Sequence, residues 1–231
     1  MRVLVTRPEG QADRTATRLR TAGHDPVLAP VLAIKATGTA WPAPLNALVL
    51  TSAQAALAMP DTAASDWRDV PAFAVGERTA QALRERGFST VTTSGSDAAA
   101  LATLMAATLP PGAGVLYAAG HDRKPVLEQA LAAAGLALSV VEVYAARPAP
   151  DWDPAIRTSL QAGALDAVLH YSARSAGLAL AQADAAGARE AFLALRHHCV
   201  SEDAAAPLVA AGATIVEIAS HPDEDSLLAT L

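Results

Sequence analysis

Cysteine, lysine and long apolar runs are scarce in this chain, and each scarcity excludes a class of protein. Cys199 is the only cysteine, so an internal disulfide is impossible, which is typical of a reducing compartment. Only Lys35 and Lys124 are lysines, and the net charge is −6, which argues against a general nucleic-acid-binding surface. The first apolar run is too short for a signal peptide, and no run approaches the ~20 residues of a membrane span. We therefore expect a cytoplasmic protein without a nucleic-acid or membrane partner.

The motifs of several common enzyme classes are also missing. The chain contains neither G-x-G-x-x-G nor G-x-x-x-x-G-K-[ST], so it signals no dinucleotide or P-loop nucleotide site. It has no G-x-S-x-G nucleophile elbow. His197-His198-Cys199 offers metal-binding residue types, but neighbours on a strand point to opposite faces, and no second cluster has ligand spacing. We expect no metal site.

What the chain does contain is an internal repeat. The stretch LNALVLTSAQAA returns as LDAVLHYSARSA, and two further segments return at similar separations, with glycines closing both copies. The paired segments are 45–56 with 165–176, 75–87 with 200–212, and 2–23 with 114–135, at offsets of 120, 125 and 112 positions. The shared order and spacing indicate a duplication, and therefore a two-lobed protein.

Each repeated segment combines a short apolar run with a helical stretch that ends at a glycine. The runs VLVT, ALVL, AFAV, VLYA, AVLH and HHCV are unalternating, as in strands covered on both faces. Helices are predicted over Gln11–Ala22, Arg78–Arg86 and Val126–Ala134, before glycines 23, 87 and 135. This alternation predicts an α/β fold of two similar lobes, each a mostly parallel sheet flanked by helices.

Two Pro-rich stretches interrupt the alternation and suit connections between lobes. They are ATGTAWPAP at 36–44 and ARPAPDWDP at 146–154, and each carries a Trp. The β-rich segments VLAIKA and VVEVYAA lie just before them. We expect these two segments to pair as a two-stranded hinge that joins the lobes.

Polar residues follow the predicted strands at the edge where ligands bind in parallel sheets. Arg7, Ser52 and Ser172 come after strands, and Thr79 lies one turn into a helix. Ser52 and Ser172 also suit helix N-caps, and Thr51 with Gln54 fits a capping box. The two interpretations are compatible, because helix N-termini present free N–H groups and a partial positive charge to anions. Tyr144, on a predicted strand, and the arginines Arg7, Arg147 and Arg174 are open to structural or functional roles.

Taken in order, these segments resemble the uroporphyrinogen-III synthase family. The similarity rests on VLVTRPEGQA, ALVLTSAQA, VGERTAQALRERG, VEVYAARP and the closing DEDSLLATL, and it extends over essentially the whole chain. The resemblance implies that the chain begins in one lobe, crosses to the other and returns. Domain A would comprise 1–35 and 149–231, domain B would comprise 36–148, and the active-site cleft would lie between them.

The resemblance also implies a reaction and a set of residues. The family is a lyase that cyclises hydroxymethylbilane, a linear tetrapyrrole polycarboxylate, to uroporphyrinogen III with inversion of ring D and loss of water, in heme biosynthesis. It uses no cofactor and is usually monomeric. By position, Tyr144 matches the tyrosine that assists departure of the hydroxyl, and the substrate-binding positions match Arg7, Ser52, Thr79 and Ser172.

This chain departs from the family pattern at a few positions, and other functions remain open. Ala119-Gly120 stands where the family often has Arg-Gly, and Ala204 and Ser201 replace a usual threonine and glycine. The main alternative is a cytosolic two-lobed binding or sensor module for an anionic metabolite, without turnover. A flavodoxin-like redox protein is disfavoured, because TRPEGQ lacks a hydroxyl-rich phosphate loop after the first strand.

Overall fold

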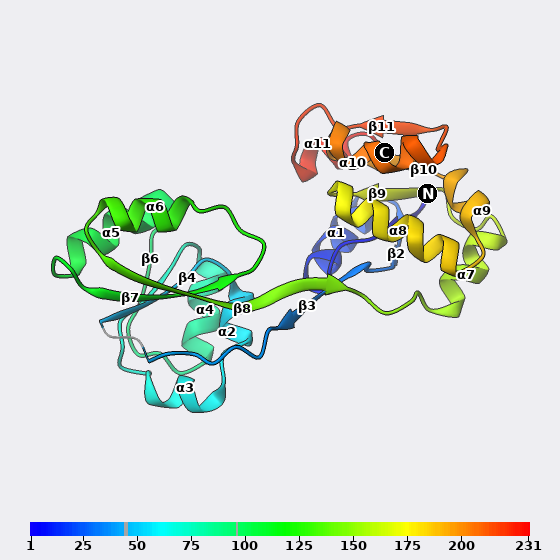
Figure 1. The fold of residues 1–231 in the computed structure, drawn as a ribbon. Coiled ribbons are helices and arrows are strands. Elements are labelled where there is room, and N and C mark those ends of the chain that lie inside the picture. The colour runs from blue at the N-terminus through cyan, green and yellow to red at the C-terminus, as the bar shows by residue number, and fades with distance from the viewer. Residues whose placement is uncertain (44–45, 96) are drawn as a thin grey trace. The chain divides into compact units, whose positions relative to one another are not determined.

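The chain divides into two compact units, each with its own sheet. The computed structural model describes residues 1–43, 46–95 and 97–231. Unit 1 comprises Met1–Ala33 and Arg147–Leu231, and unit 2 comprises Ile34–Ala146 (Figure 1). Pro44, the last residue of the predicted connection 36–44, and Leu45, the first of the repeated stretch 45–56, lie outside the described residues. No helix among the described residues is long and apolar enough to cross a membrane.

Unit 1 contains a five-stranded sheet in the order β11-β10-β9-β1-β2, and all its strand pairs are parallel. Val3, Leu4 and Val5 are fully buried, as the unalternating apolar run predicts for a strand covered on both faces. The strands are β1 (Arg2–Val5), β2 (Asp25–Leu28), β9 (Ala167–His170), β10 (Arg196–Cys199) and β11 (Val216–Ile218). The helices are α1 (Glu9–Thr21), α7 (Pro154–Gln161), α8 (Ala173–Ala185), α9 (Arg189–Leu193), α10 (Glu202–Ala211) and α11 (Glu224–Leu228).

Unit 2 contains a six-stranded sheet in the order β3-β8-β7-β4-β5-β6, with parallel pairing from β8 to β6. Helices flank this sheet as well (Figure 1). The strands are β3 (Leu32–Ala36), β4 (Ala47–Leu50), β5 (Ala72–Ala74), β6 (Val91–Thr93), β7 (Gly114–Gly120) and β8 (Ala137–Pro148). The helices are α2 (Ala53–Leu57), α3 (Asp61–Asp66), α4 (Glu77–Glu85), α5 (Ala98–Thr108) and α6 (Val126–Ala133).

The two β-rich segments predicted to pair do so, as β3 and β8. Thr37 N donates to Val143 O at 3.0 Å, and Ala149 N donates to Val31 O at 3.0 Å. Residue numbers therefore rise along one strand as they fall along the other, so this pair is antiparallel. Both strands extend across the division between the units.

The sequence repeat is also a structural repeat. The order β2-β1-β9-β10-β11 in unit 1 matches β8-β7-β4-β5-β6 in unit 2, with β3 as an added strand. Val3 pairs with Ala167 in one sheet, as Val115 pairs with Ala47 in the other, which reproduces the offsets of 112 and 120. The registers of β10 and β5 reproduce the offset of 125. The two sheets therefore repeat residue by residue.

The helices α1, α4 and α6 each end one residue earlier than predicted. The residue before each glycine serves as the C-cap instead of continuing the helix. Gly23, Gly87 and Gly135 then take φ values of +83°, +92° and +74°, which other residues rarely adopt. The three predicted glycine stops are confirmed.

A pair of histidines lies in the core of unit 1. His170 and His197 are both 0% exposed, and His170 Nε2 lies 3.1 Å from His197 Nδ1. Nδ1 of His170 is buried without a hydrogen-bond partner. Burial lowers the pKa of His170 well below its usual value. It lowers the pKa of His197 to about 4, against the opposing effect of the Phe192 backbone. Both rings are therefore neutral in the folded protein at neutral pH.

The neighbouring His198 has different partners. Its Nδ1 lies 2.7 Å from Thr230 Oγ1, whereas His197 packs edge-on against Phe192 at 5.1 Å between ring centres. Within the described ranges, no group of three or more His, Cys, Asp or Glu residues is placed to hold a metal ion. The histidine run serves the packing of unit 1.

Candidate functional site

In unit 1, the polar residues after β1 and β9 lie at the same edge of the sheet. These strands are parallel neighbours, so Arg7 after β1 and Tyr171-Ser172 after β9 emerge side by side. The guanidinium carbon of Arg7 lies 4.1 Å from the centre of the Tyr171 ring. A cation over an aromatic face at this distance is attractive. The structure thus brings the predicted residue Arg7 against Tyr171, which was not among the predicted site residues.

Glu224, at the start of α11, joins these groups into one cluster. Its Oε1 accepts hydrogen bonds from Arg7 Nη1 at 2.8 Å and from the Tyr171 hydroxyl at 3.1 Å. The Thr15 hydroxyl donates to the same oxygen, and Arg18 Nη1 lies 3.2 Å from the other. We call Arg7, Thr15, Tyr171 and Glu224 the Arg7 cluster.

The charges in the Arg7 cluster are fixed by its surroundings. Partial burial opposes ionisation of Glu224, but the Thr15 hydrogen bond and the Arg7 charge outweigh it, so its pKa is lowered. Burial, together with the Glu224 charge, raises the pKa of Tyr171 to about 12. At neutral pH the cluster therefore holds an ionised carboxylate, a protonated phenol and the guanidinium of Arg7, whose side chain is 20% exposed. The cation available to a ligand is already compensated by Glu224.

Ser172 and Ser52 are the N-caps of α8 and α2. Ser172 Oγ accepts a hydrogen bond from Ser175 N at 3.1 Å, and Ser52 Oγ accepts one from Gln54 N at 3.2 Å. The predicted caps are confirmed, but the capping box that begins at Thr51 is wrong. The Thr51 hydroxyl instead pairs with the hydroxyl of Tyr117, on β7, at 3.0 Å.

Replacing Ser172 by Ala should lower the free energy of unfolding by about 1 kcal/mol, because the first turn of α8 loses its capping acceptor. Ser172→Asn should retain most of the stability, since Asn caps as well as Ser does. The measurement is urea unfolding of both variants beside the parent protein. A parent-like midpoint for Ser172→Ala would contradict the capping role.

In unit 2, three predicted site residues lie on a strand of the sheet or shortly after one. Ser52 follows β4, Thr79 is the third residue of α4 after β5, and Tyr144 lies on β8. The order β8-β7-β4-β5 brings these elements into one part of the sheet. Thr79 is only 5% exposed, so its side chain belongs largely to the packing of α4. Tyr144 is half-buried.

Beside Tyr144 lies a charged network that sequence reasoning missed. His121 Nδ1 lies 2.7 Å from one oxygen of Glu142, and Arg123 Nη1 donates to the other at 2.8 Å. Hydrogen bonds from Arg123 and His121 lower the pKa of Glu142. Arg123 Nη1 also donates to Gly120 O at 2.8 Å. The run HDRK directly after β7 was the available signal for this network.

Tyr171 and Glu224 could have been identified by similar signals. Tyr171 immediately precedes Ser172 in the repeated stretch, at the position equivalent to Thr51. Glu224 belongs to the closing segment DEDSLLATL. Tyr117, the partner of Thr51, lies within the strand VLYA. These residues are polar groups at predicted strand ends or in the segments that carry the family resemblance.

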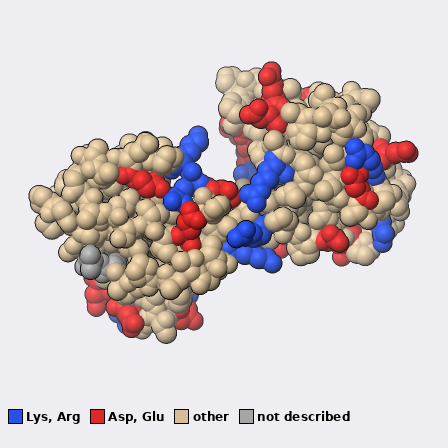
Figure 2. Space-filling view, viewed as in Figure 1, with Lys and Arg blue, Asp and Glu red and all other residues tan. Residues whose placement is uncertain are grey.

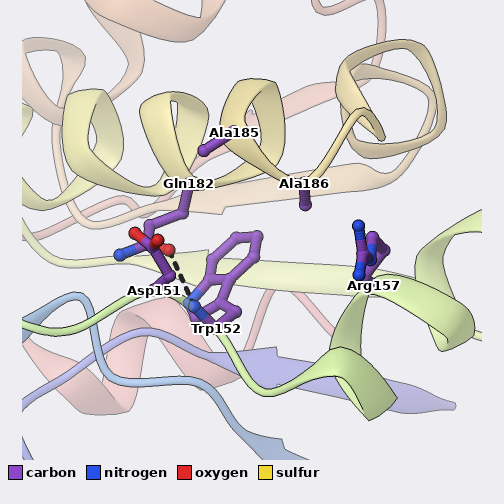
Figure 3. Close-up of a pocket in the computed structure, with 6 residues that line it drawn as sticks. All are labelled: Asp151, Trp152, Arg157, Gln182, Ala185 and Ala186. Atoms are coloured by element: carbon purple, nitrogen blue, oxygen red, sulfur yellow. Dashed lines mark hydrogen bonds between the residues drawn. The ribbon is translucent and has the colours of Figure 1, made fainter.

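A cavity of about 140 Å³ in unit 1 lies apart from all the predicted site residues (Figure 3). Gln182 Oε1 accepts from Trp152 N at 2.9 Å, as the dashed line shows, and Gln182 Nε2 donates to Pro150 O at 3.0 Å. Trp152 Nε1 donates to Ala29 O at 3.2 Å. These groups hold the segment before α7 against α8, so we assign the cavity a structural role. It is lined by Asp151, Trp152, Arg157, Gln182, Ala185 and Ala186.

On the face that Figure 2 shows, charged side chains lie in small groups. Figure 2 shows a mostly uncharged face, on which Lys and Arg lie close to Asp and Glu in several places. The Arg123 network and the Arg7 cluster have this mixed character.

The family model described as "Uroporphyrinogen-III synthase HemD" matches residues 13–229. The chain belongs to the uroporphyrinogen-III synthase family. The resemblance predicted from the sequence is therefore confirmed. No curated protein gives a significant match to this member of the family.

Solved structures of synthases are similar to this family member along its whole length. One from Helicobacter pylori 26695 has a TM-score of 0.56 at 18% identity, covering 100% of this chain and 98% of its own. One of a mutant synthase from Thermus thermophilus has a TM-score of 0.46 at 19% identity, covering 100% of this chain and 96% of its own. The first supports the fold, and the predicted α/β class with two mostly parallel, helix-flanked sheets is confirmed.

Proposed function

We propose that this protein is a uroporphyrinogen-III synthase, a lyase that cyclises hydroxymethylbilane to uroporphyrinogen III with loss of water and inversion of ring D. The observation that carries the proposal is the family match over residues 13–229. We further propose that it acts as a cytoplasmic monomer without a cofactor. The reaction needs none, because the pyrrole itself expels the hydroxyl group.

The substrate is a flexible polycarboxylate that also closes spontaneously, to the non-inverted isomer I. The enzyme must therefore fix one conformation of the chain more than supply a strong acid or base. Charge-assisted hydrogen bonds to carboxylates suit this task, because they are directional and stronger than neutral ones. A site built from an arginine, helix N-caps and a tyrosine is consistent with such a reaction.

In unit 1 we assign substrate binding to Arg7 and Ser172. Arg7 is held in place by the Arg7 cluster, so a substrate carboxylate meets a guanidinium whose position is already set. Ser172 opens α8, a helix of 13 residues, and the N-terminus of a helix favours an anion through its partial positive charge. Both residues lie at the carboxyl edge of parallel strands, where ligands bind in this fold class.

In unit 2 we assign substrate binding to Ser52 and Thr79, and hydroxyl departure to Tyr144. Because α2 has only five residues, Ser52 acts through its hydroxyl rather than through a helix dipole. Thr79 is almost wholly covered in the folded protein, so its contribution is to shape the wall of the site. The Tyr144 phenol donates a hydrogen bond to the departing hydroxyl.

The test is the isomer composition of the product. Hydroxymethylbilane made freshly by a deaminase is incubated with this protein, with heat-inactivated protein, or alone, and the oxidised porphyrins are separated. We expect isomer III with the active protein and isomer I in both controls. If demonstrably folded protein yields only isomer I, the proposed synthase activity is excluded. The protein would then be interpreted as a binding module without turnover. Unchanged hydroxymethylbilane retained by the protein would favour that module directly.

A further inference from the structure

The ring of Tyr144 occupies the space that a side chain at residue 120 would fill. A Cβ built on Gly120 would lie 2.6 Å from Tyr144 Cζ and 2.7 Å from its hydroxyl oxygen. Both distances are far shorter than a van der Waals contact between a carbon and these atoms. Tyr144 therefore keeps its place only because residue 120 lacks a side chain.

Backbone conformation is not the reason for this glycine. Gly120 is the last residue of β7, and its φ lies outside the left-handed region in which many of the other glycines lie. Alanine would fit the backbone there, and the three atoms nearest to its Cβ would all belong to the Tyr144 side chain. By contrast, a Cβ added to Gly177 in α8 would meet nothing within 4 Å. The steric requirement at residue 120 is specific to its neighbour.

Hydrogen bonds hold β7 and β8 together around this contact, so the backbone of Tyr144 cannot easily move away from residue 120. The register between β7 and β8 shifts at Ala119/Gly120, which sets Gly120 opposite Tyr144. His121 N donates to Tyr144 O at 2.9 Å, just after this bulge. Arg123 binds both Gly120 O and Glu142 at 2.8 Å, and so ties the end of β7 to β8. Bulges commonly re-aim a side chain in this way.

We propose that Gly120 is a positioning residue for Tyr144. Because Gly120 has no side chain, the Tyr144 ring packs directly against its Cα. This contact fixes the direction in which the phenol hydroxyl points. The role of the hydroxyl in turnover rests on the proposed function, whereas the positioning of the ring by Gly120 does not.

Gly120→Ala should displace the Tyr144 ring and lower kcat about tenfold or more, because small misplacements of a reacting group are costly. KM should change by no more than about twofold, since the carboxylate-binding residues stay in place. Gly177→Ala is the matched control and should keep parent-like kinetics. In the Tyr144→Phe background, which itself turns over slowly, Gly120→Ala should cause no further loss of kcat. An equal loss in both backgrounds would overturn the proposal, because Gly120 would then act independently of the hydroxyl.

A second readout needs no enzymatic activity. The chain has three tyrosines, so ring-labelled tyrosine gives three NMR signals, and Tyr144→Phe assigns one of them. Gly120→Ala should move the Tyr144 signal and leave that of Tyr171 in place, whereas Gly177→Ala should move neither. A Tyr144 signal that is unchanged in Gly120→Ala would overturn the proposal. If the parent protein makes no isomer III, the proposed function fails. The NMR signals alone then test whether Gly120 positions the Tyr144 ring.

A rescue variant covers the case in which Gly120→Ala folds poorly. Tyr144→Ser removes the ring, so the added Cβ meets open space in Gly120→Ala/Tyr144→Ser. The double variant should then unfold at a temperature close to that of Tyr144→Ser alone. A double variant as unstable as Gly120→Ala would show that the alanine disturbs something other than the ring, and it would overturn the proposal.

Discussion

Lowering the pH from 7 to 5 should cost the folded protein about 2 kcal/mol through His197 alone. The unfolded chain binds a proton on this ring near the ordinary histidine pKa of about 6.5. The folded protein does not do so until about pH 4, because burial lowers that pKa. The unfolded state therefore binds more protons between these values, so the stability present above pH 6.5 is lost as the pH falls. His170, whose pKa is also lowered by burial, adds to the loss in the same direction.

Urea unfolding at pH 7, 6 and 5 measures this effect. Carboxylates with lowered pKa values, such as Glu224, lose their contribution only below about pH 4.5, so they do not contribute in this window. His170→Leu/His197→Leu replaces both partners of the buried hydrogen bond by apolar groups, and it should flatten the pH dependence. The exposed His221→Gln is the control and should retain the parent slope. If the free energy of unfolding of the double variant depends on pH as in the parent protein, groups other than His170 and His197 take up the protons.

Removing the charge of Arg7 should raise KM for hydroxymethylbilane by roughly tenfold to a hundredfold, the value of one charge-assisted hydrogen bond. Arg7→Gln keeps much of the side-chain volume but loses the contact with the substrate carboxylate. Glu224→Gln should act in the opposite direction and lower KM, because the Arg7 charge is then no longer compensated by Oε1 of Glu224.

The two variants are informative together because Arg7→Gln should raise KM and Glu224→Gln should lower it. Steady-state kinetics at two salt concentrations should show a weaker salt dependence for Arg7→Gln, since one charged contact is missing. Arg189→Gln breaks an exposed ion pair with Asp184 elsewhere in unit 1 and should leave the kinetics unchanged. If Glu224→Gln raises KM as Arg7→Gln does, Glu224 serves to hold the arginine in place rather than to compensate its charge.

Local patterns were sufficient to predict most of the fold. Apolar runs and terminal glycines are short-range signals, so the six central strands and the helix stops could be located from the sequence. The strands β2, β6 and β11 were missed, and all three lie at the edge of a sheet or next to solvent. They have only three or four residues and are partly exposed, so they carry no continuous apolar run.

The polar clusters were predictable only in part, because their members meet through tertiary structure. Arg7 was named from its place after a strand, but its partner Glu224 lies 217 positions away. The contact between Gly120 and Tyr144 depends on a register shift, and a register shift leaves no periodic trace in the sequence. Ser52 and Ser172 were predicted as caps because capping is local.

The discontinuity of unit 1 sets the order in which the protein assembles during synthesis. Unit 2 is one continuous segment, 34–146, so it is complete before the second part of unit 1 leaves the ribosome. Val3 in β1 must wait for Ala167 in β9, which at about 5–20 residues per second takes roughly ten to thirty seconds. For that time an apolar strand destined for the middle of a sheet is without one neighbour. Until then the apolar residues of β1 lack part of their cover, whereas unit 2 already has all the residues it needs to fold.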